Sequence, residues 1–453
     1  MTQLLPPSLL SQELPLISRD AESKPWSFSD RGYYDITPPS EISETPDAFS
    51  HPIQVSIDKD TRPLVAVIGV GYVGEHLVNV FSNNYSVLGF DVSEVRAQQL
   101  ADKHEANGKA RFTSNACDLS EATHFLISVP TLLLPDKTID SSYLRSALSA
   151  VGLYARRGAT VVIESSVAVG MTRELLGPLA KERGYFAGMS PERVDPGRVE
   201  PAAYAIPKVV SGLDDVVPGS LDAITRLYSQ CFQQVIPVSQ PEVAEMMKLY
   251  ENCQRMVCIA YANEMADACH GHNIDPFEVC RAASTKPFGY MPFSPGLGVG
   301  GHCIPVNPWY LLSNSPFPVL KMASEKMMAR PDAVAQRAVD HLRAESRDVL
   351  RHRVLVVGIG FKRGQSHLAN SPGLELAKSL VLTNKVDVAW ADPLVRQDAV
   401  PQIARLAESD WTVESLEQMF DMIIIAFHQE GLDFDVLDRV QGVHVQHWCA
   451  RGE

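Results

Sequence analysis

The sequence has no excess of basic residues, no long apolar run and no closely paired cysteines. Its 40 lysines and arginines face 54 acids, a net charge of −14, which argues against a nucleic-acid-binding protein because phosphate backbones need clustered basic side chains. No apolar stretch approaches the roughly 20 residues that cross a bilayer, so we expect no membrane anchor. The eight cysteines form no CxxC pair, which indicates reduced thiols in a cytoplasmic protein and gives no reason to predict a metal site.

The first 61 residues differ in composition from the rest of the chain. They are rich in proline and serine and can bury little apolar surface, so we expect a disordered arm. They also lack a basic segment followed by an apolar run, which argues against a secretory signal. The arm is either a passive tail or a docking segment.

From Leu64 onward, short β-rich apolar runs alternate with polar helical stretches. The pattern appears in LVAVIG, YSVLGFD, HFLISVP and ATVVIESS, and it returns after Arg351 in HRVLVVGIG, KVDVAWADP and DMIIIAFH. Such alternation is typical of βαβ units and a parallel sheet. We predict an α/β fold with two doubly wound, Rossmann-like domains, at 62–238 and 331–453, on either side of a helical central part at 239–330.

A long helix is predicted at the start of the central part. Ser239 and Glu242 have the spacing of a capping box, and the stretch that follows has helical character as far as His270, before Gly271. Such a helix is long enough to join the two α/β domains.

A glycine motif directly follows the first apolar run. Gly69, Gly71 and Gly74 form G-x-G-x-x-G at the start of an expected helix, where a turn and a helix N-terminus can hold a pyrophosphate. Asp91 lies 17 residues beyond Gly74, at the end of the next strand, where a carboxylate can bind both ribose hydroxyls. An acid there repels a 2′-phosphate, so NAD is favoured over NADP. The alternative is a glycine turn that binds nothing.

A second glycine cluster surrounds one cysteine. The stretch SPGLGVGGHCIPVNPWYL begins at position 294 and places Cys303 after four glycines and before two prolines. Glycine lets a backbone approach a ligand closely, whereas proline fixes the chain. A free cysteine is usually a small buried hydrophobe, but this polar loop favours a reactive thiol.

Several motifs together resemble those of the UDP-glucose/GDP-mannose dehydrogenase family. They span the chain from Leu64 to its C-terminus, and the sequences KPFG and GGHCIP most resemble those of the branch that acts on UDP-N-acetylglucosamine. The motifs are GVGYVG, SVPT, ESSV, SPERVDPG, KLYEN, TKPFGYMPFSPGLGVGGHCIPVNP and GFKRGQSHLANSP.

The resemblance implies an NAD-dependent oxidation of the C6 alcohol of a nucleotide sugar to a carboxylate, in two hydride transfers, for polysaccharide biosynthesis. It implies that Cys303 is the nucleophile, that Lys248 and Asn252 stabilise an oxyanion at the reacting carbon, and that Glu192 activates the hydrolytic water. It also implies a homodimer that packs through the central helix. The residues expected to bind NAD are Gly69, Val70, Gly71, Tyr72, Val73, Gly74, Asp91, Arg96, Pro130, Thr131 and Ser166, and those expected to bind the substrate are Lys248, Asn252, Gly298, Gly300, Phe361 and Lys362.

Three positions depart from the family pattern. Asn307 replaces an acid, Ala369 an arginine that helps to bind NAD, and Cys449 an arginine that contacts the substrate. Two other functions therefore stay open. One is a diverged relative that binds NAD or the nucleotide sugar without turnover; the other is a one-step hydroxyacid dehydrogenase, although such an enzyme has no use for a nucleophilic cysteine.

Overall fold

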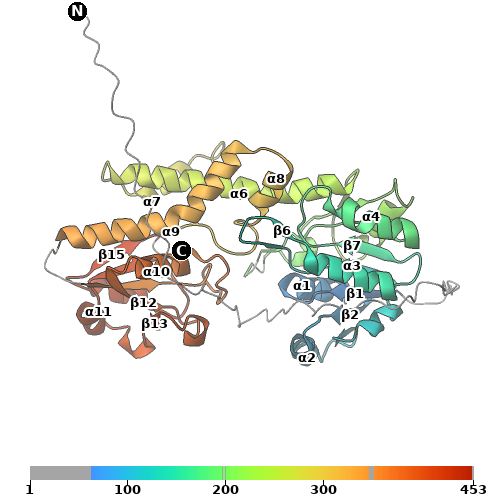
Figure 1. The fold of residues 1–453 in the computed structure, drawn as a ribbon, viewed down its shortest axis with the longest axis horizontal. Coiled ribbons are helices and arrows are strands. Elements are labelled where there is room, and N and C mark those ends of the chain that lie inside the picture. Colours follow the sequence, from blue (N-terminus) through green and yellow to red (C-terminus); the bar gives the residue numbers. More distant parts are fainter. Residues whose placement is uncertain (1–62, 196, 199, 346–350, 451–453) are drawn as a thin grey trace, which may run out of the picture. The chain divides into compact units, whose positions relative to one another are not determined.

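The first sheet has eight strands in the order β10-β9-β8-β7-β4-β1-β2-β3 (Figure 1). The computed structural model describes residues 63–450 except 196, 199 and 346–350, so the predicted arm at 1–61 lies outside the described residues. All neighbouring strands are parallel except β8 and β9, which are antiparallel. The strands are β1 (Leu64–Ile68), β2 (Ser86–Phe90), β3 (Ala110–Thr113), β4 (His124–Ile127), β7 (Thr160–Ile163), β8 (Phe186–Met189), β9 (Lys208–Gly212) and β10 (Val235–Pro237).

Both faces of this sheet are buried. Along β1, Ala66 and Ile68 pack into one apolar cluster, whereas Val65 and Val67 pack into another on the opposite face. Because successive side chains of a strand point to opposite faces, a run that is apolar at every position requires cover on both. The helices of this domain are α1 (Tyr72–Phe81), α2 (Glu94–Lys103), α3 (Ser142–Tyr154), α4 (Met171–Arg183) and α5 (Ser220–Ser229), and a small antiparallel pair is formed by β5 (Leu132–Leu133) and β6 (Ile139–Asp140).

The central helix α6 (Pro241–His270) ends where the sequence predicts, but the predicted capping box does not form. Gln240 is the N-cap residue, and it contributes no side-chain cap to the helix. Glu242 instead pairs with Arg173 of α4, with Nε and Oε1 2.6 Å apart. Proline at the first helical position sets the start of α6 without a capping side chain, because its missing N–H would be unpaired there in any case.

Three further helices follow: α7 (Pro276–Ser284), α8 (Asn307–Asn314) and α9 (Pro318–Glu345). Helix α9 lies beside α6, and Arg330 of α9 is paired with Asp267 of α6 at 2.7 Å (Figure 1). Position 330, where we place the end of the central part, lies inside α9. None of the helices in the described ranges has an apolar stretch long enough to cross a membrane.

The C-terminal sheet has five parallel strands in the order β13-β12-β11-β14-β15. Val354 and Val356 of β11 face one apolar cluster, and Leu355 and Val357 face the other, so this sheet is also buried on both faces. The predicted second α/β domain is therefore present. Its elements are β11 (His352–Val357), α10 (Pro372–Leu382), β12 (Val386–Ala391), β13 (Ala404–Arg405), α11 (Val413–Met419), β14 (Met422–Ile425) and β15 (His444–His447).

Candidate active site

The predicted dinucleotide motif forms the tight turn between β1 and α1. Gly69 has φ of +84°, a conformation that L residues rarely adopt. A Cβ at Gly74 would lie 2.0 Å from the carbonyl oxygen of Gly69, so only glycine fits there. Gly71 is the N-cap of α1 and carries no capping side chain, which leaves the N-terminal amides of the helix facing the turn.

Asp91 lies at the end of β2, beside the turn, as the sequence predicts. Its Oδ2 accepts a hydrogen bond from the amide of Val70 at 3.1 Å, and its Oδ1 accepts one from Ser93 at 3.0 Å. Arg96 is fixed nearby, since its Nε donates to the carbonyl of Val70 and its Nη2 pairs with Glu75, both at 3.0 Å. The turn is thus held in one shape before any ligand binds.

The other residues predicted to bind NAD follow the ends of neighbouring strands. Thr131, after Pro130 and β4, donates its hydroxyl to the carbonyl of Ser166, after β7, at 2.7 Å. The Tyr72 hydroxyl donates to the carbonyl of Asp195 at 3.2 Å. The side chain of Val70 is fully buried in an apolar cluster, so only its backbone atoms are available to a ligand, whereas Val73 packs against the same cluster and is half-buried.

Helix α6 directs Lys248 and Asn252 into the protein, where both are buried. The ammonium of Lys248 lies 3.5 Å from Oε2 of Glu192. Cys303 is an exposed residue, but the surrounding protein atoms desolvate its thiol and raise its pKa. Lys248 opposes that rise and Glu192 adds to it, so both charges act on the thiol. Lys248 and Glu192 thus lie side by side, and both are near enough to Cys303 for their charges to act on its thiol.

Desolvation also raises the pKa of Glu192, and the ammonium groups of Lys248 and Lys208 oppose this rise. Beneath Glu192 lies a second buried pair, in which Lys208 Nζ is 2.6 Å from Oε2 of Glu164. Tyr228 donates its hydroxyl to the same carboxylate. In the sequence, Glu164 stands out only as part of the ESSV motif, and Lys208 was not predicted as a site residue. The two lie 44 positions apart, and no spacing pattern relates residues at that distance.

Asn252 is held by two side-chain hydrogen bonds. Its Nδ2 donates to Oδ1 of Asn307, and its Oδ1 accepts from Nη2 of Arg255. An amide oxygen at position 307 can therefore do for Asn252 what the expected acid would do, which is to accept a hydrogen bond. Arg255 was missed in the sequence, although its place one helical turn after Asn252 is a signal that could have found it.

The glycines of the cysteine loop pack against the segment 361–372. A Cβ at Gly300 would lie 3.0 Å from Cβ of Phe361, and the amide of Gly301 donates to the carbonyl of Ala369 at 2.9 Å. A Cβ at Gly298 would likewise lie 3.2 Å from Pro372. These glycines therefore allow close packing of two backbones, a reason that the sequence did not reveal.

Lys362 extends this contact to the first domain. Its ammonium lies 3.0 Å from Oδ1 of Asp195, a residue of the SPERVDPG motif. Of the basic residues that could compensate for the two missing arginines, Arg363 lies 3.9 Å from Glu430, and Arg451 is outside the described residues. Cys449 packs against the second apolar cluster of the C-terminal sheet.

The comparisons agree with this arrangement. Residues 63–232 match the NAD binding domain of the UDP-glucose/GDP-mannose dehydrogenase family, and residues 242–325 match its central domain. The chain is 33% identical over 360 residues to the UDP-N-acetyl-D-glucosamine 6-dehydrogenase of Pseudomonas aeruginosa, which covers 73% of this chain and 83% of the relative. It is 30% identical over 375 residues to the UDP-N-acetyl-D-mannosamine dehydrogenase of Pyrococcus horikoshii, which covers 76% of this chain and 87% of the relative.

Among solved structures, the UDP-D-ManNAc dehydrogenase of Pyrococcus horikoshii superposes with a TM-score of 0.72 at 26% identity, covering 85% of this chain and 99% of that one. The Rossmann-like fold and the NAD cofactor predicted from the sequence are thus confirmed. By its motifs, its domains and its relatives, this chain belongs to the UDP-glucose/GDP-mannose dehydrogenase family.

Proposed function

We propose that this protein oxidises the C6 alcohol of a nucleotide sugar to a carboxylate by a covalent mechanism on Cys303. The observation that supports it most directly is that Lys248 and Glu192 pair with each other and that both charges act on the Cys303 thiol. One alcohol, one water and two NAD⁺ give one carboxylate, two NADH and three protons. NAD accepts a hydride in each of the two oxidations.

Cys303 is needed for the second oxidation. An aldehyde cannot lose another hydride until a nucleophile adds to its carbonyl carbon, and a thiolate adds well. Sγ bonds to that carbon to give a thiohemiacetal, loss of the hydride gives a thioester, and water releases the acid. The raised pKa of Cys303 favours the thiol, so the ammonium of Lys248 is needed to stabilise the thiolate.

Lys248 and Glu192 have separate roles in the steps in which sulfur and water add to the carbonyl carbon. The ammonium of Lys248 stabilises the oxyanion that forms when sulfur, and later water, adds to the carbonyl carbon. Glu192 accepts the proton of the attacking water.

UDP-N-acetylglucosamine is the substrate that we propose first. The 33% identical relative from Pseudomonas aeruginosa is a dehydrogenase of this sugar, and the loop sequence resembles that branch. The relative from Pyrococcus horikoshii acts on the mannosamine epimer, which is the second candidate. A few contacts to the sugar ring decide between such epimers.

A panel of nucleotide sugars with NAD⁺ tests this function, with NADH absorbance and product mass as readouts. We expect two NADH for each acid formed. Cys303→Ala should make no acid while it still binds NAD, whereas Cys117→Ala, which changes another exposed cysteine, should behave as the parent protein. Acid production by Cys303→Ala at the parent rate would refute the covalent mechanism. Failure of every sugar on the panel would instead favour the non-catalytic alternative.

We also propose a homodimer that packs through α6. One side of this helix leaves Val243, Met246, Tyr250 and Tyr261 exposed, at spacings of three, four and eleven residues that keep them on one face. Tyr250→Lys with Tyr261→Lys should yield a monomer in sedimentation experiments, and an unchanged dimer would exclude this interface.

A further inference from the structure

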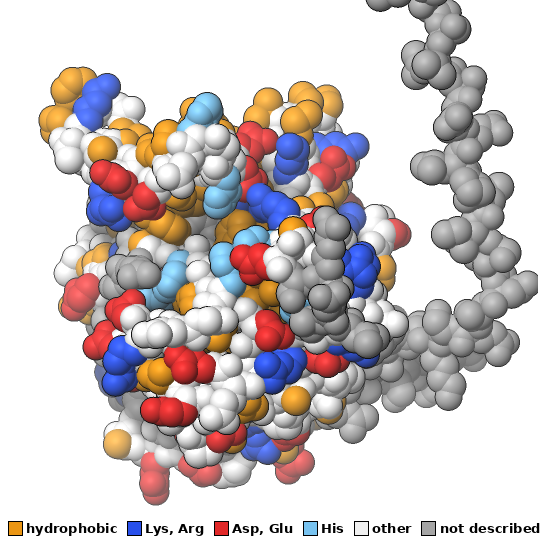
Figure 2. All heavy atoms as spheres, turned by 90° about the vertical axis from the view of Figure 1, so that its left-hand side faces the viewer, with side chains coloured by type: hydrophobic (Ala, Val, Ile, Leu, Met, Phe, Trp, Pro, Cys, Tyr) orange, Lys and Arg blue, Asp and Glu red, His pale blue; other side chains and the backbone are white. Residues whose placement is uncertain are grey.

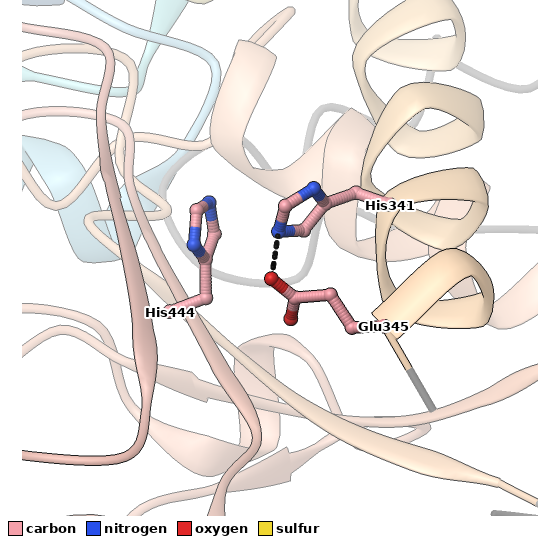
Figure 3. Close-up of side chains that lie close together, drawn as sticks. All are labelled: His341, Glu345 and His444. Atoms are coloured by element: carbon pink, nitrogen blue, oxygen red, sulfur yellow. Dashed lines mark ion pairs between the residues drawn. The ribbon is translucent and has the colours of Figure 1, made fainter. Parts of the chain in front are cut away.

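Two histidines and a glutamate of the C-terminal part meet away from the proposed catalytic group. His341 and Glu345 lie on the last turns of α9, and His444 is the first residue of β15 (Figure 3). One ligand atom of each, an imidazole nitrogen or a carboxylate oxygen, lies within 4.8 Å of the others. Several histidines are visible together on the face shown in Figure 2.

The backbone fixes the three positions. His341 and Glu345 are four residues apart and so lie on the same face of the helix. His444 is held in the sheet, where β15 pairs with β14, and its amide donates to the carbonyl of Asp421 at 3.0 Å. The two imidazole rings lie side by side at an interplanar angle of 41°, with centroids 4.1 Å apart. The side chains therefore converge from a helix and a strand that are far apart in the sequence.

The surroundings of one imidazole nitrogen in this group suit metal binding. Nε2 of His341 is shielded from solvent and lies 3.2 Å from Oε1 of Glu345, but the described residues offer it no well-directed hydrogen bond. A buried ring nitrogen without such a bond costs free energy unless a ligand takes it. The lone pair of a neutral imidazole nitrogen is such a ligand-binding group, and it binds metal ions.

We propose that His341, Glu345 and His444 bind a divalent transition metal ion, with Zn²⁺ as the ion of choice. Two imidazoles and one carboxylate form a known zinc ligand set that leaves one position open, whereas Ca²⁺ and Mg²⁺ favour oxygen ligands alone. Ligands about 2.0–2.2 Å from a tetrahedral ion lie roughly 3.4 Å from one another. The observed separations of up to 4.8 Å would close by small side-chain rotations.

The ion would tie the end of α9 to the edge strand of the C-terminal sheet. None of the three ligand residues belongs to the group around Cys303, so we expect the ion to change the stability of the protein and not its reaction. The site exists only in the folded chain, because its residues come from a helix and a strand that are far apart in the sequence. Saturating Zn²⁺ should therefore stabilise the folded state and raise the melting temperature.

Metal analysis and thermal melting of the full chain, stripped with EDTA and free of any affinity tag, test this site. The variants are His341→Gln, Glu345→Gln and His444→Gln, and the matched control is His272→Gln, which changes an exposed histidine. The parent and the control should each bind one more equivalent of Zn²⁺ than the three variants. Losing a ligand should weaken zinc binding by at least about 100-fold, since losing an outer partner of a ligand already costs about 10–100-fold.

A substitution that adds a spectroscopic signal distinguishes metal bound at this site from metal bound elsewhere, for example by cysteines. His444→Cys keeps a ligand atom at the site, so with Co²⁺ it should gain a thiolate-to-cobalt charge-transfer band that the parent lacks. Equal zinc content and equal melting in the parent and the three glutamine variants would overturn the proposal. A rise in melting temperature as large with Mg²⁺ as with Zn²⁺ would overturn the choice of a transition metal.

Discussion

Asn307→Leu is the change that best tests how the buried amides hold the reacting groups. Asn252 and Asn307 are 0% and 2% exposed, and Nδ2 of Asn252 donates to Oδ1 of Asn307. Leucine fills a similar volume but removes the acceptor. It leaves an N–H of Asn252 without a partner in a site that solvent does not reach, while Arg255 still bonds to the other end of the amide.

An unsatisfied buried donor costs about 1–3 kcal/mol. We therefore expect the free energy of unfolding to fall by about 1–3 kcal/mol. If Asn252 must keep its orientation during the reaction, the same loss should lower the turnover rate by about 5- to 150-fold. Urea titration gives the first quantity, and NADH production from UDP-N-acetylglucosamine gives the second.

Two controls separate the hydrogen bond from the loss of an amide. Asn307→Asp keeps an oxygen acceptor and restores the acid that the family pattern expects, so most of the stability and turnover should remain. Asn314→Leu makes the same chemical change at the exposed end of α8, where the amide makes two long contacts of 3.4 Å, with Ser313 and Val169, and should have little effect. Parent-like stability and turnover in Asn307→Leu would show that this bond positions nothing.

Three further changes probe other parts of the chain. Lys208→Met should lower the free energy of unfolding in urea by about 3–5 kcal/mol, because it leaves the carboxylate of Glu164 buried and unpaired, and Glu164→Gln in the same chain should recover part of the loss. Desolvation would raise the pKa of Asp267, but Arg330 and Arg337 together outweigh it and the pKa is lowered. This stability is present above the pKa of the unfolded carboxyl and is lost as the pH falls through the folded pKa, so Asp267→Asn should destabilise the protein at neutral pH and much less in strong acid. Ala369→Arg should tighten NAD⁺ binding by about 10- to 150-fold in calorimetry, and an unchanged affinity would mean that the cofactor's phosphates do not reach this position.

Local signals in the sequence were enough to predict that each α/β domain has a sheet, and they located the central strands. The apolar runs that become β1, β2, β4 and β7 are read directly, because strands covered on both faces are apolar at every position. Edge strands such as β10 and β13 were missed because they are two or three residues long and half exposed. The prediction of a capping box at Ser239 and Glu242 was wrong for a different reason: the carboxylate of Glu242 accepts a hydrogen bond from Arg173, which is distant in the sequence.

The cofactor loop was predictable from local chemistry, whereas the catalytic group required the family resemblance. Gly69, Gly74 and Asp91 act through one turn and two adjacent strands, so their spacing carries the information. Lys248 and Glu192 are separated by a whole βα unit, and no periodicity relates them. Their pairing is a property of the fold, and the sequence could indicate it only by its likeness to other chains.

The glycines around Cys303 show how tertiary contacts can determine a sequence that looks like a ligand loop. Gly301 bonds through its carbonyl to Asn370 and through its amide to Ala369, while its open side faces the ring of Phe361. Any side chain at Gly300 or Gly301 would push the loop away from this segment and displace Cys303, two residues further on. Since Lys362 of the same segment pairs with Asp195, the position of the nucleophile is coupled to the contact between the C-terminal segment and the SPERVDPG motif. Pro308 lies in the first turn of α8 and helps to fix where this helix starts, and Asn307, at the beginning of α8, is directed at Asn252.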